Sequence, residues 1–87
     1  MAVVRLATDL RSYAEGRSTL EVDGATLGEV LVALEKMYPA VGRRVTDERG
    51  RLRRHVNVFI GADRQVDPAA PVSAKDEVSI LPAVSGG

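Results

Sequence analysis

Apolar and polar residues alternate along several short stretches of the chain, which is the pattern of strands that bury one face. The stretches that show it are residues 2–8, 18–22, 55–60 and 77–81, with a shorter one at 64–66. In the stretch 55–60, Val56, Val58 and Ile60 fall on one side, while Asn57 and Phe59 fall on the other. The expected apolar row across the sheet consists of Val4, Leu6, Leu20, Val22, Val56, Val58, Val78 and Ile80.

One longer stretch, residues 26–38, has the spacing of a helix instead. Thr26 is placed to cap its N-terminus, and Glu29 completes a capping box. Pro39 ends the helix, because the residue before a proline is pushed out of helical geometry. The apolar stripe of this helix consists of Leu27, Val30, Leu31, Leu34, Met37 and Tyr38.

Polar segments connect these elements. Residues 9–17 are expected to form a turn between the first two strands, and Val41 and Val45 to anchor a short helical turn. The order strand, strand, helix, strand, short strand, strand predicts an α+β domain in which the helix covers one face of the sheet. The 87 residues suffice for one such core.

Composition narrows the classes of function. Twelve Lys and Arg balance twelve Asp and Glu, which argues against a dedicated nucleic-acid or membrane-surface protein, since both need a positive excess. The chain has no cysteine, so disulfides, thiolate metal sites and cysteine nucleophiles are excluded. No signal segment and no apolar run of membrane-spanning length is found. A cytoplasmic protein is expected.

The C-terminal stretch "VSILPAVSGG" combines a strand with a segment that has little to pack. Pro82 cannot donate a ladder hydrogen bond and fixes φ, so it is expected to end the strand and begin an extended arm. Gly86 and Gly87 have no Cβ to obstruct a narrow active site. Small polar termini are usually frayed ends without function, and that interpretation competes with a working tail.

Three stretches, "ATLGEVLVALEKMYP", "HVNVFIG" and above all "VSILPAVSGG", resemble the ubiquitin-like β-grasp proteins of the bacterial sulfur-carrier (MoaD/ThiS) family. The resemblance covers essentially the whole chain and is nearest to the thiocarboxylate-forming carrier of cysteine synthesis. It implies a mixed four- to five-stranded sheet packed on one main helix. It divides the chain into a β-grasp domain, residues 1–81, and a flexible C-terminal arm, residues 82–87.

The resemblance also implies a chemistry for the tail. A partner E1-like enzyme would adenylate the carboxylate of Gly87 with ATP, and a sulfur donor would displace AMP to leave a thiocarboxylate. That sulfur would then pass to a downstream sulfur-accepting synthase, with the chain acting as a co-substrate and not as an enzyme. No cofactor would be bound by the chain itself. The residues expected to enter the partner's active site are Pro82, Ala83, Val84, Ser85 and Gly86.

Several alternatives stay open at this point. The family includes the small subunit of molybdopterin synthase, and the acceptor could be activated serine, a molybdopterin precursor, a thiazole precursor or a sugar. A ubiquitin-like protein modifier, whose Gly87 forms an amide with a target lysine, would have the same ending. An inert β-grasp interaction module is the third possibility. The free protein is expected to be a monomer.

Other residues carry weaker signals. Phe59 and Leu81 point away from the expected core face, so they form either a partner-binding patch or a surface covered by neighbouring long side chains. Half of the basic residues lie in the Arg-rich segment 43–54, which is either a docking surface for an acidic partner or a solvated loop. His55 has no companions for a metal site, and Ser85 has no base to activate it.

Overall fold

The computed structural model describes residues 2–82 of the chain. Its strands are β1 (Ala2–Leu6), β2 (Thr19–Val22), β3 (Val56–Ile60), β4 (Asp63–Arg64) and β5 (Glu77–Pro82). Its helices are α1 (Thr8–Arg11), the 3₁₀ helix η1 (Ser12–Ala14), α2 (Leu27–Met37) and α3 (Pro39–Val45). The expectations for Ala83, Val84, Ser85, Gly86 and Gly87 lie outside the described residues.

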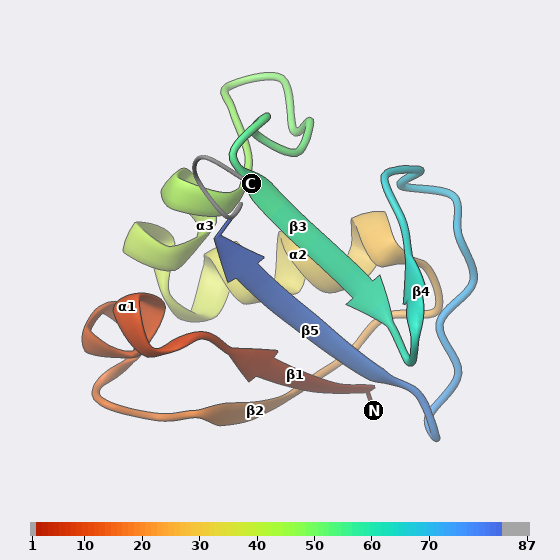
Figure 1. Cartoon of the computed structure of the whole chain (residues 1–87), viewed down its shortest axis with the longest axis horizontal. Coiled ribbons are helices and arrows are strands. Elements are labelled where there is room, and N and C mark those ends of the chain that lie inside the picture. Colours follow the sequence, from red (N-terminus) through yellow and green to blue (C-terminus); the bar gives the residue numbers. More distant parts are fainter. Residues whose placement is uncertain (1, 83–87) are drawn as a thin grey trace.

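The strands form one five-stranded mixed sheet in the order β2-β1-β5-β3-β4 (Figure 1). The first and last strands of the described chain, β1 and β5, are parallel neighbours with Val4 opposite Val78. The other neighbouring strands are antiparallel. Because β5 pairs with β1 on one side and with β3 on the other, it occupies the middle of the sheet. The expected α+β arrangement with a mixed sheet on a main helix is confirmed.

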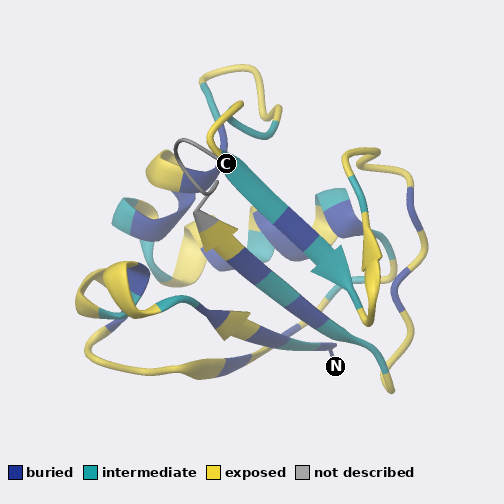
Figure 2. Cartoon of the chain, in the orientation of Figure 1, coloured by how far each residue is buried: buried dark blue, intermediate teal, exposed yellow. Residues whose placement is uncertain are grey.

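The core lies between the sheet and α2, as the alternation along the strands predicts. Figure 2 shows buried residues alternating with less buried ones along β1 and β5, whereas in β3 Val58 is buried and the other residues are half-buried. Leu6 and Ile80 from the sheet are fully buried, as are Leu27 and Leu34 from α2. Burying side chains of this size stabilises the fold by about 1.5–3 kcal/mol each relative to leaving them exposed.

Helix α2 begins as the capping box predicts and ends slightly earlier than its apolar stripe suggests. Thr26 Oγ1 accepts the Glu29 N–H at 3.2 Å, and Glu29 Oε1 accepts the Ala25 N–H at 2.8 Å. Tyr38 leaves helical geometry and packs, half-buried, against the core. Met37 was expected in the buried stripe but is 45% exposed, and it occupies the last helical position.

The segment after β1 differs from the expected strand end and turn. Thr8 begins helix α1 instead of continuing the strand, and η1 follows at Ser12. The reason is that two apolar side chains of this segment, Leu10 and Ala14, are buried in the core. They are four residues apart, which places them on the same face of a helical connection. The Arg11 Nε donates to the Leu6 carbonyl at 3.1 Å, which holds this connection to the end of β1.

Helix α3 is longer than the single turn expected from the sequence, and it packs closely on α2. Val41 and Val45 are fully buried, as expected. Gly42 faces α2 so directly that an added Cβ would lie 2.5 Å from Cγ and 2.6 Å from Cβ of Glu35. The glycine therefore sets the spacing of the two helices.

Candidate functional site

The last strand brings the start of the tail to one end of the sheet. Pro82 is the final residue of β5 and stands opposite Val56, the first residue of β3. The strand was expected to stop at Leu81, so the arm begins one residue later than predicted. Proline is tolerated at this position because neither neighbouring strand needs a hydrogen bond from its backbone nitrogen.

The Val58 carbonyl accepts the Gln65 N–H at 2.9 Å, so the polar backbone groups of Val58 point away from β5. The N–H and C=O groups of successive residues point to alternate sides of an antiparallel strand, so the N–H and C=O of Val56 also point away from β5. Val56 and Pro82 therefore form a pair without hydrogen bonds between them. On its other side β5 pairs with β1 only as far as Ile80. The missing N–H of Pro82 is therefore required by neither neighbour.

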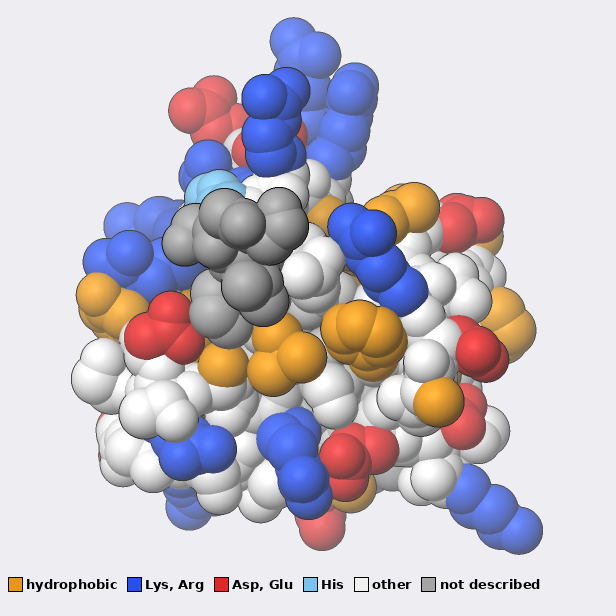
Figure 3. All heavy atoms as spheres, in the orientation of Figure 1, with side chains coloured by type: hydrophobic (Ala, Val, Ile, Leu, Met, Phe, Trp, Pro, Cys, Tyr) orange, Lys and Arg blue, Asp and Glu red, His pale blue; other side chains and the backbone are white. Residues whose placement is uncertain are grey.

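The face of the sheet opposite α2 presents a small apolar patch beside this end of β5. Phe59 lies opposite Ser79, and Leu81 lies opposite Asn57, so Phe59 and Leu81 are diagonal neighbours on the same face. Leu81 is 39% exposed and Phe59 is half-buried. Figure 3 shows hydrophobic side chains gathered over the middle of this face, with charged side chains around them. The expectation that both residues point away from the core is confirmed.

A shallow depression adjoins the end of β5. Its volume is about 250 Å³, and Leu81 and His55 line it together with Tyr13 and Arg44. The Arg44 guanidinium lies 4.0 Å from the centre of the Tyr13 ring, a cation–π contact between α3 and η1. No pattern in the sequence predicted that Tyr13 and Arg44 would meet here. They belong to elements whose packing no local pattern reveals.

The Arg-rich segment is an ordered turn and not a uniformly solvated loop. Arg43 and Arg44 belong to α3, while the remaining arginines follow a tight turn closed by a bridge between Thr46 and Leu52. Asp47 Oδ1 accepts the backbone N–H groups of Arg49 and Arg51 at 2.9 and 3.0 Å. The left-handed φ of 80° at Gly50 completes the turn.

The same hydrogen bonds change the acidity of Asp47. The N–H of Arg51 is the main reason that the pKa of Asp47 lies below its ordinary value, and the N–H of Arg49 acts in the same direction. The positive charges of Arg51 and Arg53 lower the pKa further. The carboxylate is thus charged wherever the turn is formed at neutral pH.

Residues 2–82 contain no cluster of three or more His, Cys, Asp or Glu side chains that could hold a metal ion. Within the same residues, no helix has the length and apolar character needed to cross a membrane. The described part of the chain thus offers a sheet end, an apolar patch and a basic turn, with the predicted reacting group beyond them at Gly87.

A mixed sheet grasping one main helix, with its C-terminal strand in the middle, defines a β-grasp protein of the ubiquitin-like class. Residues 4–87 match the model of the ThiS family, so the chain belongs to the ThiS family. The predicted resemblance to the sulfur-carrier family is confirmed.

Individual relatives agree with this assignment. The chain is 36% identical to the sulfur carrier protein CysO of Mycobacterium tuberculosis over 90 residues, covering 97% of this chain and 96% of that protein. It is 38% identical to small archaeal modifier protein 1 of Haloferax volcanii over 85 residues, covering 95% and 97%. Among solved structures, a chain of the Amycolatopsis orientalis BexX/CysO complex superposes with a TM-score of 0.88 at 30% identity, covering 100% of both chains.

Proposed function

We propose that this protein is a sulfur carrier whose Gly87 carboxylate is converted to a thiocarboxylate. The observation that carries the proposal is the near full-length similarity to a protein named as a sulfur carrier. The protein is a co-substrate of partner enzymes and has no catalytic residue of its own in this scheme.

The reaction requires activation, because a carboxylate resists nucleophilic attack. The Gly87 carboxylate oxygen attacks the α-phosphorus of ATP, and the β and γ phosphates leave together as pyrophosphate. Sulfide then attacks the acyl carbon of the adenylate; the carbon–oxygen bond to AMP breaks, and one proton is released. The ATP is bound by an E1-like adenylating enzyme, and the reaction takes place in the cytoplasm, where ATP is supplied.

The geometry of β5 supports a tail that works inside another protein. The five residues 83–87 can extend at most roughly 18 Å beyond the sheet. Such an arm, comprising Ala83, Val84, Ser85, Gly86 and Gly87, reaches a buried active site while the domain stays outside. We further propose that Phe59 and Leu81, which flank the start of the arm, contact the partner surface.

The final acceptor belongs to a downstream synthase. We propose cysteine synthesis or the synthesis of a specialised sulfur-containing metabolite, supported by the CysO relatives. A second candidate function, a ubiquitin-like protein modifier, is favoured by the 38% identity to small archaeal modifier protein 1. In that case Gly87 forms an amide with a lysine of a target protein.

The deciding experiment is intact-mass analysis after incubation with the cognate adenylating enzyme, ATP and sulfide. A sulfur carrier gains the mass difference between one sulfur and one oxygen, and the gain is lost when Gly87 is deleted. Absence of the gain with a competent enzyme contradicts sulfur carriage. Conjugates larger than the free protein in cell extracts, abolished by the same deletion, support the modifier function.

A further inference from the structure

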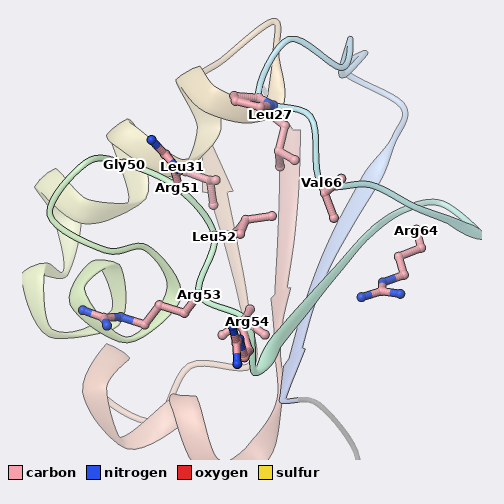
Figure 4. A pocket seen from close by; sticks show the side chains of 11 residues that line it. Leu27, Leu31, Gly50, Arg51, Leu52, Arg53, Arg54, Arg64 and Val66 are labelled. Atoms are coloured by element: carbon pink, nitrogen blue, oxygen red, sulfur yellow. The ribbon is translucent and has the colours of Figure 1, made fainter.

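A groove opens at the outer edge of the sheet, between the Arg-rich turn and the segment that follows β4 (Figure 4). Its volume is about 480 Å³. It opens beyond β3 on the side away from β5, and its lining includes Val56, which stands opposite Pro82 at the start of the tail. The groove is lined by Leu27, Leu31, Gly50, Arg51, Leu52, Arg53, Arg54, Val56, Arg64, Val66 and Pro68.

The floor and walls of the groove are apolar. Leu27 and Leu31 of α2 form the buried floor. In Figure 4, Leu52 points into the groove from the Arg-rich turn, while Val66 lies on the opposite wall. Val66 is 69% exposed, a high value for a large hydrophobic side chain. An open apolar surface of this kind is typical of a binding site.

The rim of the groove is positively charged. Arg51 and Arg54 come from the wall that the Arg-rich turn forms, and both are exposed. Arg64 borders the groove from β4 but stands opposite Phe59, so its side chain leaves from the other face of the sheet (Figure 4). Arg53 instead turns toward α3, where its Nε donates to the Arg43 carbonyl at 2.8 Å (Figure 4). Within residues 2–82 the one salt bridge joins Arg5 to Glu77, so no described carboxylate lies within 4.0 Å of the rim arginines.

The charge of the whole chain is distributed unevenly around this groove. Residues 43–54 hold six arginines, Asp47 and Glu48, a net charge of +4. The other residues hold six basic and ten acidic side chains, a net charge of −4, and the two parts sum to the net charge of zero. A neutral protein with a basic end attracts acidic surfaces to that end.

The edge of β3 beside the groove lacks a full strand neighbour. On this side β3 pairs with β4 at Phe59 and Ile60 alone, and the hydrogen bond from Gln65 to the Val58 carbonyl ends the contact. The Val56 carbonyl points to the same edge by the alternation along the strand. An extended chain lying in the groove would find a main-chain acceptor there.

We propose that this groove binds an extended peptide segment of a partner protein, in which apolar side chains are followed by carboxylates. The apolar side chains fill the space between Leu52 and Val66, and the carboxylates pair with Arg51 and Arg54. The site is independent of the Gly87 chemistry and of the Phe59 and Leu81 patch. It gives the carrier a second contact, by which a partner can hold the domain while the tail is in use.

A peptide accounts for the observations better than a small amphiphilic anion does. A single anionic head group would neutralise one or two positive charges, whereas residues 43–54 carry a net charge of +4. The exposed main chain of β3 also has no role in binding an aliphatic molecule. The two occupants give different results in the following experiment.

The test is an NMR titration of the ¹⁵N-labelled full-length protein with a capped peptide of sequence Val-Ile-Val-Leu-Asp-Glu-Asp-Glu. We expect the shifts to concentrate on the amides of Leu52, Val56, Val58 and Val66. Binding should weaken markedly when salt is raised to about 0.5 M, since exposed ion pairs are screened. A peptide with lysines in place of the acidic residues should bind at least about tenfold more weakly.

Protein variants make the test specific. Val66→Glu should weaken binding of the acidic peptide by about tenfold or more, because it places an unpaired charge in the apolar groove. Arg54→Glu should act in the same direction through the rim. Val32→Glu and Arg17→Glu introduce the same changes at exposed sites outside the groove, and they should leave the affinity unchanged.

The proposal is overturned by any of three results. These are no binding of the acidic peptide, shifts centred on Phe59 and Leu81, or equal binding of the lysine peptide. Shifts in the groove with decanoate but none with the peptide would identify a site for small amphiphiles instead. All of these readouts are independent of thiocarboxylate formation, so failure of the sulfur-carrier assay leaves this test intact.

Discussion

Pro82 stands opposite Val56 in the last pair of the β3–β5 ladder, two residues beyond Ile80, the last residue of β5 that pairs with β1. The arm therefore leaves the domain from a fixed position in the middle of the sheet, not from a loose edge. Fixing that position reduces the number of conformations that the arm must lose when it enters a partner.

Pro82→Ala should leave stability almost unchanged, because no ladder hydrogen bond depends on this position. We expect the free energy of unfolding to change by less than about 1 kcal/mol. Adenylation by the partner should slow by about two- to fivefold in kcat/KM, since alanine frees φ at the start of the arm. Denaturant unfolding and a pyrophosphate-release assay measure the two effects. A loss of several kcal/mol would show that Pro82 supports the sheet itself.

Phe59→Ser and Leu81→Ser should weaken binding to the adenylating enzyme by about tenfold, measured by calorimetry. The expected loss of stability is about 1 kcal/mol, because neither side chain is fully buried. Val32→Ser is the matched control, since Val32 is a 57% exposed residue on α2. Equal binding by all three variants would show that the outer face of the sheet does not contact the adenylating enzyme. A large fall in Tm for Phe59→Ser would assign that side chain to the core.

Gly42→Ala should destabilise the domain by about 1–3 kcal/mol, as expected for overpacking. The added methyl group meets the Cα, Cβ and Cγ atoms of Glu35, and the backbone atom cannot move aside without shifting α2. Thermal unfolding monitored by circular dichroism gives the value. Glu35→Ala serves as the control, because this exposed residue makes no salt bridge among residues 2–82 and its replacement should be nearly neutral. An unchanged Tm for Gly42→Ala would contradict the close packing of α2 on α3.

The Arg-rich turn should lose order in acid through Asp47. The folded-state pKa of Asp47 lies below its ordinary value of 3.8, so the charged carboxylate favours the formed turn. This contribution is complete above the unfolded pKa and disappears as the pH falls through the lower folded pKa. An NMR titration should show the amides of Arg49 and Arg51 shifting together with the Asp47 carboxyl below about pH 4. Asp47→Asn should lack this shared titration; its persistence would assign the change to another group.

The sequence predicted the elements whose pattern is local. The alternation in residues 55–60 and 77–81, and the capping box of Thr26 and Glu29, placed three main elements within a residue or two. Helix α1 and η1 were missed because their two anchors, Leu10 and Ala14, lie among polar residues and are buried only by distant parts of the chain. The secondary structure of such segments depends on tertiary packing, which a short stretch of sequence does not show.

Some residues of the candidate site could likewise be predicted from local sequence patterns, and others could not. Leu81 and Phe59 could be assigned to the outer face from strand alternation alone. The Arg-rich segment could not be interpreted, because only the fold places the turn that Asp47 holds across a groove from Val66. What distinguishes this segment from a solvated loop is the apolar groove beneath it, and the sequence shows only its charges.

The central place of β5 has a consequence for how the protein is made. Until Glu77–Pro82 has left the ribosome, β1 and β3 have no strand to join them, and the sheet exists as two unpaired halves. Partial chains of this kind expose apolar surface and strand edges, which chaperones and proteases recognise. We expect a nascent chain interrupted before this strand to be degraded. The folded protein in the cell would then consist of chains translated to within a few residues of Gly87, because the sheet cannot be completed without β5.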